Sequence, residues 1–365
     1  MEYRNLPHGG QEVSTIGIGA GSLYEAGAKE VESIIHTGME HGVNLMDTVM
    51  YDETAVEPVT RALKGCRDKM VIQMHLGAVY PKGVYSRTRV LDKVRKGFEH
   101  ELKKYGTDYA DIGIIHCVDG ERDVEEVLNG GIFEYARKLK QDGVIRYLGF
   151  SSHDPGTCRR FLETDEIDVF MLSLNAAYDF EPHRDKLALS QERADLYREC
   201  QKRGVRITVM KPYGGGQLLN SETSPFHRAM TIPQCIQYAL DRPAVLSCLP
   251  GVRSVADLQD ALRYYDASAE ERDYSFIGSL PHRDMQGACI YCNHCQPCPS
   301  GIDIGAVNKY LDLAKAGDEL ARDHYVQLSR HATDCTGCGV CEKNCPFHVD
   351  VRGRMLEAKK FFSRV

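Results

Sequence analysis

Residues 110–116 read ADIGIIH and residues 144–151 read VIRYLGFS, two short runs rich in strand-forming apolar residues. Between them, residues 123–141 place apolar side chains at helical spacing. The three segments predict a strand, a helix and a second strand that runs parallel to the first. This βαβ unit decides the fold, because the same alternation recurs along most of the chain.

Outward from this unit, further strands and helices alternate in both directions. The other predicted strands are 15–19, 43–47, 70–76, 168–174, 205–210 and 245–250. The other predicted helices are 29–41, 53–64, 86–105, 154–163, 184–203, 231–241 and 254–265. Eight such units match an α/β fold of the (β/α)8 TIM-barrel type, which typically takes ~250 residues. A doubly wound open sheet is the alternative, but it needs no eighth unit and normally places a glycine-rich phosphate turn after its first strand.

Polar or titratable residues stand at the ends of nearly all the predicted strands. They are Asp47, His75, His116, Ser151 with Ser152 and His153, Asn175, Lys211 and Arg253. Each alone could cap a helix or lie in solvent. Because barrel enzymes gather their chemistry at the C-terminal ends of the strands, the ring as a whole predicts a site for a small-molecule substrate.

Composition places the chain among ordinary globular proteins: 365 residues, 42% hydrophobic and a net charge of −7. The net charge is negative, and no run of basic residues alternates with aromatics. Neither nucleic acid nor an anionic membrane is therefore expected as a partner. No apolar run approaches the ~18 residues that cross a bilayer, and the start MEYRNLPHGG lacks the pattern of a secretion signal. We therefore expect a cytoplasmic protein.

The chain holds 14 cysteines, unevenly distributed. Those scattered through the first 288 residues are expected to be buried in the core: Cys66, Cys117, Cys158, Cys200, Cys235 and Cys248. The others lie close together in residues 289–345. A disulfide framework is not expected here, because such frameworks are typical of small secreted domains. These closely spaced cysteines are therefore predicted to be metal ligands.

Two motifs carry these ligands, CIYCNHCQPCP at 289–299 and CTGCGVCEKNCP at 335–346. The second has the bacterial ferredoxin spacing, in which three thiolates hold one [4Fe-4S] cluster and the fourth reaches the other cluster. Crossed ligation assigns cluster one to Cys289, Cys292, Cys295 and Cys345. It assigns cluster two to Cys335, Cys338, Cys341 and Cys298. Uncrossed ligation and two zinc sites are the alternatives.

The cysteine motifs also mark the domain organisation. We expect the barrel to occupy residues 1–270, and a small, mostly helical ferredoxin-like domain with two [4Fe-4S] clusters to occupy residues 271–365. The stretch between the motifs shows helical apolar spacing, as at Ile304, Val307 and Leu311.

Several barrel segments resemble the aldo-keto reductases. They are NLMDTVMYDETAVEPVTRALKG (44–65), DIGIIH (111–116), IRYLGFSSH (145–153), VMKPYGGGQLL (209–219) and LPGVRSVADLQDAL (249–262). The resemblance runs through the first 270 residues. Together with the cysteine motifs, it is a resemblance to the iron–sulfur aldo/keto reductases.

The resemblance implies an oxidoreductase that moves hydride between NADP(H) and a carbonyl or alcohol substrate. Matched residue by residue, Tyr51 is the general acid, Asp47 supports it, and His116 orients the carbonyl. His75 occupies the place of the family's lysine. The resemblance also implies a set of residues that contact the cofactor, among which Arg253 and Ser254 hold a 2′-phosphate. The set is Ser151, Ser152, Asn175, Lys211, Gly214, Gly251, Arg253 and Ser254.

The sequence departs from the family pattern in further places. Asp47 and Tyr51 are one position closer than usual, Met171 replaces a glutamine and Ala261 replaces an asparagine that contacts the cofactor. Two other functions therefore stay open. One is acid–base chemistry without a nicotinamide, such as elimination or epimerisation of a sugar or hydroxy acid. The other is a cluster-bearing subunit that passes electrons to a partner.

Overall fold

The computed structural model of the chain describes residues 1–183, 186–279, 287, 289, 291, 293–315, 317–345 and 347–363. The side chains of residues 182, 183, 186, 187 and 279 also lie outside this description, as does the predicted ligand Cys292. None of the described helices is long and apolar enough to span a bilayer.

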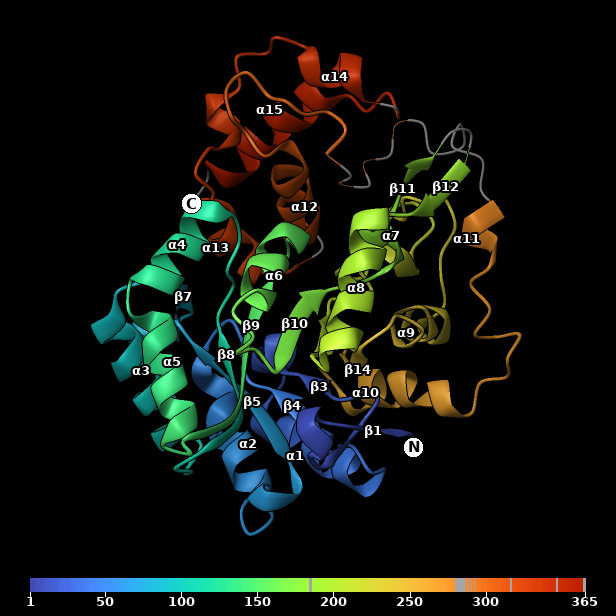
Figure 1. Cartoon of the computed structure of the whole chain (residues 1–365). Coiled ribbons are helices and arrows are strands. Elements are labelled where there is room, and N and C mark those ends of the chain that lie inside the picture. The colour runs from blue at the N-terminus through green and yellow to red at the C-terminus, as the bar shows by residue number, and fades with distance from the viewer. Residues whose placement is uncertain are drawn as a thin grey trace. The chain divides into compact units, whose positions relative to one another are not determined.

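Parallel strands form the barrel, at the positions that the sequence predicts (Figure 1). They are β3 (Ile18–Gly19), β4 (Leu45–Asp47), β5 (Val71–Leu76), β8 (Ala110–Ile115), β9 (Ile145–Ser152), β10 (Val169–Ser173), β13 (Arg206–Met210) and β14 (Val245–Leu249). They pair in chain order from β3 to β14. Parallel bridges Ile16–Cys248 and Gly19–Gly251 join the first strand to the last and close the barrel.

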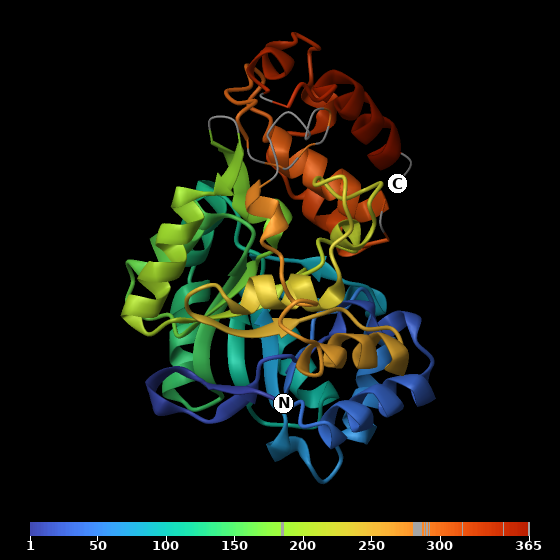
Figure 2. The same cartoon turned by 90° about the vertical axis from the view of Figure 1, so that its right-hand side faces the viewer.

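Helices surround these strands (Figure 2). They are α1 (Ala28–Glu40), α2 (Val56–Ala62), α3 (Leu91–Lys104), α4 (Glu121–Asn129), α5 (Ile132–Gln141), α6 (Pro155–Leu162), α8 (Gln191–Arg203), α9 (Ile232–Leu240) and α10 (Val255–Leu262). Helix α1 shows why they form there: Val31, Ile34, Ile35 and Gly38 recur at helical spacing and are buried.

Three predicted helices are too long. The expected helix at 86–105 begins at Leu91, because Ser86–Arg87 form a short strand instead. The expected helix at 123–141 is two helices, because Gly131 takes a left-handed φ of 84° between α4 and α5. The expected helix at 184–203 begins at Gln191. Ahead of it, β11 (Phe180–His183) pairs antiparallel with β12 (Lys186–Leu189), which follows the short α7 (Ala176–Asp179).

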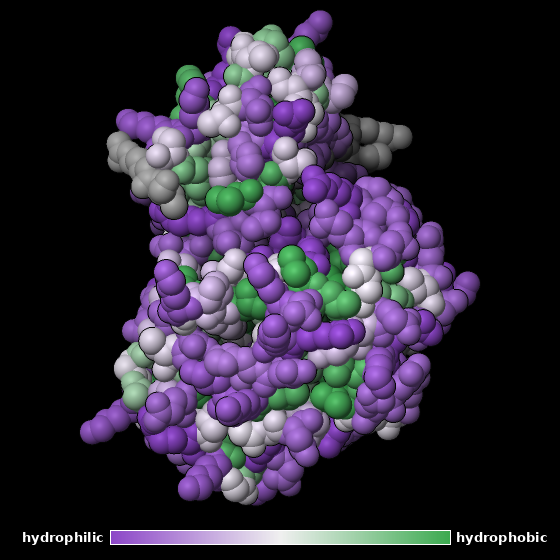
Figure 3. Space-filling model, turned by 90° about the vertical axis from the view of Figure 1, so that its left-hand side faces the viewer, coloured by the Kyte–Doolittle hydropathy of each residue, from purple (hydrophilic) through white to green (hydrophobic). Residues whose placement is uncertain are grey.

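Shorter strands complete the barrel region. β1 (Tyr3–Asn5) pairs antiparallel with β2 (Glu12–Ser14), and β6 (Ala78–Val79) pairs antiparallel with β7 (Ser86–Arg87). Every residue of β5 is buried, including Gln73 and His75. The surface drawn in Figure 3 is mostly hydrophilic, with hydrophobic residues in small separated groups.

The chain packs as two compact units that do not follow chain order. One comprises residues 1–174, 192–212 and 236–268, and contains the barrel strands. The other comprises residues 175–191, 213–235 and 269–365. The division at residue 270 stays a prediction from the sequence.

The second unit is mostly helical, as predicted. Its later helices are α11 (Phe276–Ser279), α12 (Ile304–Lys315), α13 (Leu320–Val326), α14 (Val340–Asn344) and α15 (Val351–Phe362). Asp312 on α12 accepts hydrogen bonds from the Tyr291 hydroxyl at 2.7 Å and from Arg354 of α15 at 2.6 Å. Tyr291 lies in the first cysteine motif, so these bonds tie that motif to both helices.

Candidate active site

Three of the predicted catalytic residues lie together at the C-terminal ends of neighbouring strands. Asp47 ends β4, His75 is near the end of β5, and His116 directly follows β8. The sheet order places β5 between β4 and β8, so their ends are adjacent. All three side chains are at least 95% buried.

These residues form a continuous chain of hydrogen bonds. His75 Nε2 lies 2.6 Å from Asp47 Oδ2, and His75 Nδ1 lies 2.8 Å from Nδ1 of His116. The other nitrogen of His116, Nε2, lies 2.5 Å from the hydroxyl of Tyr85. Four titratable side chains thus connect in the order Tyr85, His116, His75, Asp47.

The carboxylate of Asp47 is fixed by further donors. The Gln73 side chain donates to Asp47 Oδ2 at 2.8 Å, and the backbone N–H of Val49 donates to Oδ1 at 3.2 Å. The Thr208 hydroxyl donates to Gln73 Oε1 at 3.1 Å, which turns the amide NH2 group of Gln73 toward Asp47. Each oxygen of this carboxylate therefore accepts a hydrogen bond from a fixed donor.

Sequence reasoning missed Gln73, Thr208 and Tyr85. A signal for Gln73 existed, since it is a polar residue inside the otherwise apolar run MVIQMHL. Tyr85 carried no such signal. It lies in the connection between β5 and α3, far along the chain from His116, and only the folded barrel brings the two together.

Tyr51, the predicted general acid, lies outside this chain of hydrogen bonds. Its ring packs against that of Tyr24, with centroids 5.3 Å apart. Its backbone carbonyl accepts the N–H of Tyr85 at 2.8 Å. Tyr51 and Tyr85 are therefore held together by backbone, but it is the Tyr85 hydroxyl that contacts a histidine.

A fully buried carboxyl group, Glu101 of α3, lies behind the site. The Thr48 hydroxyl donates to Glu101 Oε1 at 2.6 Å. Burial raises the pKa of Glu101 to about 7, against the lowering effects of the Thr48 hydrogen bond and of His75. This side chain consequently titrates near neutral pH.

Two arginines hold the backbone that carries His116. Arg89 donates to the carbonyl oxygens of His116 and Cys117 at 2.9 and 2.8 Å, and Arg87 donates to that of Cys117 at 2.7 Å. Both guanidinium groups are paired with the nearly buried Asp123. The position of His116 thus depends on a shared, largely desolvated ion cluster.

The predicted cofactor residues Ser151 and Ser152 already have protein partners. Ser151 Oγ accepts the backbone N–H of Cys117 at 2.7 Å, and Ser152 Oγ donates to Asp119 at 2.9 Å. Lys211 follows β13 with a left-handed φ of 57°. In the second unit, Asn175 caps α7 through the N–H of Tyr178, and Gly214 has a φ of 60°.

The predicted 2′-phosphate residues lie at the start of α10. Ser254 caps this helix through the N–H of Asp257, and the side chain of Arg253 is 62% exposed, 3.6 Å from the Asp257 carboxylate. Glu30 accepts the backbone N–H of Val255 at 2.8 Å. Gly251 is exposed, and a side chain there would be in ordinary contact with Ser22 Oγ at 3.5 Å. The exposed arginine and the exposed glycine fit a dinucleotide phosphate, whereas the carboxylates compete with it.

Cysteines of both motifs converge in the second unit. Cys298 of the first motif and Cys335, Cys338 and Cys341 of the second line a single pocket, together with apolar groups of Ile302, Ile304 and Met355. Thiolate ligands in an apolar shell suit an iron–sulfur cluster. A side chain also joins the two motifs, because the amide group of Asn344 donates to the backbone carbonyl of Gln296 at 3.3 Å.

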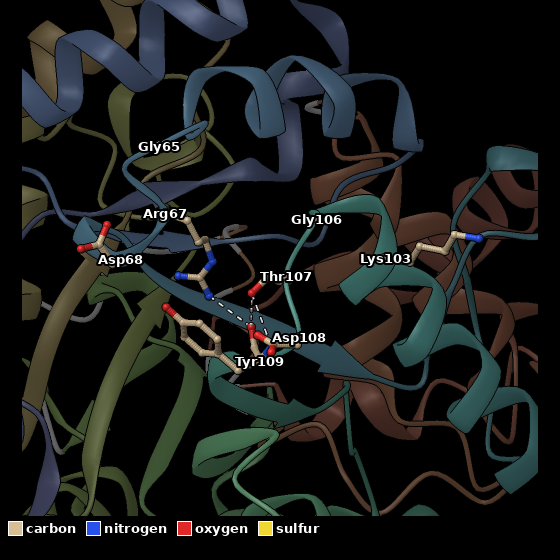
Figure 4. Close-up of a pocket in the computed structure, with 8 residues that line it drawn as sticks. All are labelled: Gly65, Arg67, Asp68, Lys103, Gly106, Thr107, Asp108 and Tyr109. Atoms are coloured by element: carbon tan, nitrogen blue, oxygen red, sulfur yellow. Dashed lines mark hydrogen bonds between the residues drawn. The ribbon is translucent and has the colours of Figure 1, made fainter.

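A separate hollow lies at the opposite ends of the barrel strands. Its lining comes from the segments before β5 and β8 and comprises Gly65, Arg67, Asp68, Lys103, Gly106, Thr107, Asp108 and Tyr109 (Figure 4). Arg67 is bonded there to the Met70 carbonyl at 2.7 Å and to Asp111 at 3.0 Å. These are contacts that hold the barrel floor, and this end of a barrel serves stability rather than chemistry.

Comparison with known proteins supports both parts of the chain. Residues 15–234 match the profile of the aldo/keto reductase family, and residues 288–350 match that of the 4Fe-4S dicluster domain. An uncharacterised oxidoreductase of Bacillus subtilis, YqkF, is 24% identical and aligns with 73% of this chain and 92% of its own length.

Solved structures show the same fold. The holo form of aldo-keto reductase AKR11C1 from Bacillus halodurans superposes with a TM-score of 0.60 at 23% identity, over 74% of this chain and 94% of its own. An aldo/keto reductase from Klebsiella pneumoniae, solved with NADP and acetate, gives a TM-score of 0.54 at 20% identity, over 73% of this chain and 91% of its own.

Proposed function

Because this chain belongs to the aldo/keto reductase family and carries a 4Fe-4S dicluster domain, we propose that it is an NADP(H)-linked oxidoreductase that interconverts a carbonyl and an alcohol. The observation that carries the proposal is the buried hydrogen-bonded set of Asp47, His75 and His116 at the C-terminal ends of the barrel strands. A reacting carbonyl needs an oriented donor and a source of protons, and this set supplies both.

The nicotinamide, when bound, supplies or accepts the hydride. We propose that Arg253, Ser254 and Gly251 receive its adenosine phosphate, and that Ser151, Ser152, Asn175, Lys211 and Gly214 contact the rest of it. The exposure of Arg253 and of Gly251 supports this. Through the Tyr85 hydroxyl, which its Nε2 contacts, the imidazole of His116 orients the substrate oxygen, and His75 is hydrogen-bonded to Asp47 behind it.

The test is titration of the anaerobically purified protein with NADPH and NADH by fluorescence, followed by turnover of a panel of aldehydes and ketones. We expect saturable NADPH binding and carbonyl-dependent oxidation of NADPH. His116→Asn is expected to lower turnover roughly 10²-fold or more. His41→Asn, at the exposed end of α1, is the matched control and is expected to leave turnover unchanged.

A second function is favoured by one observation at α10, where Glu30 occupies the Val255 N–H that a phosphate would use. If neither nicotinamide binds, the same acid–base groups serve elimination or epimerisation of a sugar or hydroxy acid. Solvent deuterium would then enter the substrate without any change in nicotinamide absorbance. That pair of results would replace the proposed reductase activity.

For the cysteines, we propose the crossed ligation of two [4Fe-4S] clusters, Cys289, Cys292, Cys295 and Cys345 on one and Cys298, Cys335, Cys338 and Cys341 on the other. The shared pocket of the second set supports it. Cys338 is exposed, which favours exchange of single electrons with a protein partner in a reducing cytoplasm. Reduction by a one-electron donor, followed by electron paramagnetic resonance, tests this role.

A further inference from the structure

We propose that Tyr85, rather than Tyr51, is the proton donor of this site, and that it is recharged through a relay of His116 and His75 that ends on Asp47. The inference rests on the proposed function for its substrate, a carbonyl compound. The relay itself rests on contacts within the barrel, and can therefore be tested even without turnover.

The relay has a definite polarity. Gln73 and the Val49 N–H donate to Asp47, and an ionised Asp47 is acceptor-only, so in the proposed relay His75 Nε2 carries its hydrogen toward the carboxylate. In a neutral His75, Nδ1 is then an acceptor and takes the Nδ1 hydrogen of His116. Nε2 of His116 is left as an acceptor, and the Tyr85 hydroxyl donates to it.

One additional proton reverses the relay. When His75 is protonated on both nitrogens, its Nδ1–H donates to Nδ1 of His116. The hydrogen of His116 must then stand on Nε2, where it donates to the Tyr85 oxygen. The phenol hydrogen is thereby turned away from His116. The first state prepares Tyr85 to accept a proton from an alcohol, and the second prepares it to give one.

The proton step balances for reduction of a carbonyl. Hydride, supplied by the reduced nicotinamide of the proposed function, forms a C–H bond, and the C=O π electrons leave an alkoxide. The Tyr85 O–H bond breaks as the alkoxide O–H bond forms. The phenolate takes the Nε2 proton of His116, and Nδ1 of His116 takes the Nδ1 proton of His75. His75 ends neutral and Asp47 stays ionised, so the site has lost one proton, which solvent returns.

The whole relay is buried, and its His116 and Tyr85 end is slightly more accessible than its Asp47 and His75 end. The relative exposure is 3% for Asp47, 1% for His75, 5% for His116 and 6% for Tyr85. The Asp47 end is closed by its other donors, so protons exchange at the Tyr85 end. Within the described part of the chain, Tyr51 meets the relay through its backbone carbonyl, and its ring packs at a tilt against that of Tyr24.

The first test is a matched pair of variants, Tyr85→Phe and Tyr51→Phe, each checked for folding by circular dichroism and iron content. We expect Tyr85→Phe to lower kcat for carbonyl reduction roughly 10²- to 10⁴-fold, with NADPH affinity unchanged. Tyr51→Phe is expected to keep kcat within about threefold, because it leaves the relay intact. The reverse result would return the acid's role to Tyr51 and overturn the proposal.

The second test does not need turnover. In protein labelled with ¹⁵N-histidine, the ring nitrogens of His75 and His116 report on the relay through their nuclear magnetic resonance shifts as pH changes. We expect Tyr85→Phe and Asp47→Asn each to shift the titrations of both rings, because the four groups share protons. Tyr51→Phe should leave both titrations in place. Unshifted titrations in Tyr85→Phe would overturn the relay, whatever the substrate proves to be.

A third variant guards against loss of packing in Tyr85→Phe. Placing 3-fluorotyrosine at position 85 keeps the ring and the hydroxyl but makes the phenol more acidic. The titratable groups packed beside the relay include Glu101 behind His75, the Cys117 thiol beside His116, and Tyr80, whose ring centroid lies 6.3 Å from that of Tyr85. Because the fluorine substitution alters none of them, a displacement of the rate profile toward lower pH belongs to Tyr85. An unchanged profile, with normal folding, would argue that Tyr85 transfers no proton.

Discussion

A histidine at position 75 changes what the site can do with a proton. The lysine that the family pattern places there has only donor hydrogens, whereas an imidazole can donate through one nitrogen and accept through the other. A lysine at position 75 could donate to Asp47 but could not accept a hydrogen bond from His116. His75 instead joins Asp47 to His116 with contacts of 2.6 and 2.8 Å, which makes the chain continuous.

The Glu30 carboxylate gives a prediction about cofactor preference. It occupies the Val255 N–H at the start of α10, where a 2′-phosphate would meet both its charge and its hydrogen bond. We expect Glu30→Gln to tighten NADPH binding about 3- to 10-fold and to leave NADH binding unchanged, because only NADPH carries that phosphate. Fluorescence titration measures both. Glu40→Gln, at the exposed end of the same helix, is the control, and equal effects on the two cofactors would contradict the prediction.

Buried Glu101 gives a prediction about pH and stability. Burial raises its pKa from 4.5 to about 7, so the folded protein binds this proton more tightly than the unfolded chain does. The group's contribution therefore falls as pH rises through this window, by up to about 3 kcal/mol. Glu101→Gln should be more stable than the native protein at pH 8 and similar at pH 5.

Unfolding in urea under anaerobic conditions at the two pH values measures this difference. Glu99→Gln on the exposed side of α3 is the control and should keep the native pH dependence. If Glu101→Gln loses stability in parallel with the native protein between pH 5 and 8, Glu101 is ionised throughout and the prediction is wrong.

At the scale of elements, the helices near the site begin at capping residues that the chain supplies locally. Asp154 accepts the N–H of Thr157 at 2.6 Å at the start of α6, and Pro155 occupies the first helical position. Thr157 in turn accepts the N–H of Gly120 through its hydroxyl at 3.1 Å. The cap thus fixes both the helix and the loop after β8.

Loss of this cap should be measurable. We expect Asp154→Ala to lower the free energy of unfolding by about 1 kcal/mol, because the Thr157 N–H loses its acceptor. Asp154→Asn keeps a capping oxygen and should cost only a small part of that. Urea unfolding followed by circular dichroism compares the three proteins. Equal losses in the two variants would show that charge rather than capping matters at this position.

At the scale of the whole molecule, the cysteine motifs are separated by a helical stretch of chain yet line a common pocket. This arrangement distinguishes the two ligation patterns. With crossed ligation, Cys298 and Cys335 hold the same cluster, so the double variant Cys298→Ala/Cys335→Ala should lose one cluster and keep about four irons. With uncrossed ligation it would lose both and keep almost none.

Iron and sulfide analysis after anaerobic purification measures this, with about eight irons expected in the native chain. Cys158→Ala is the control, since Cys158 is buried in the barrel unit and should not affect the iron content. Of the cysteines predicted to be core residues, all but the partly exposed Cys66 are buried.

The sequence by itself determined the barrel, since each strand is a short apolar run whose side chains must leave water, and alternation with amphipathic helices leaves few other ways to bury them. It also determined the two cysteine motifs, because the spacing of the cysteines within each motif is a local feature of the sequence. It also placed Asp47, His75 and His116 at strand ends. Helix limits were less well determined, as at Gly131, where one left-handed residue ended a helix that apolar periodicity alone would continue.

Only the tertiary structure decided which tyrosine contacts the histidines. The sequence pointed to Tyr51, which matches the family pattern, whereas nothing in the sequence singled out Tyr85. The hydroxyl of Tyr85 reaches His116 because the connection after β5 folds over the neighbouring strand β8, a contact between residues 31 positions apart. Sequence spacing fixes which side chains share a strand or a helix face, but hydrogen bonds across a barrel mouth depend on loop paths that no local pattern encodes.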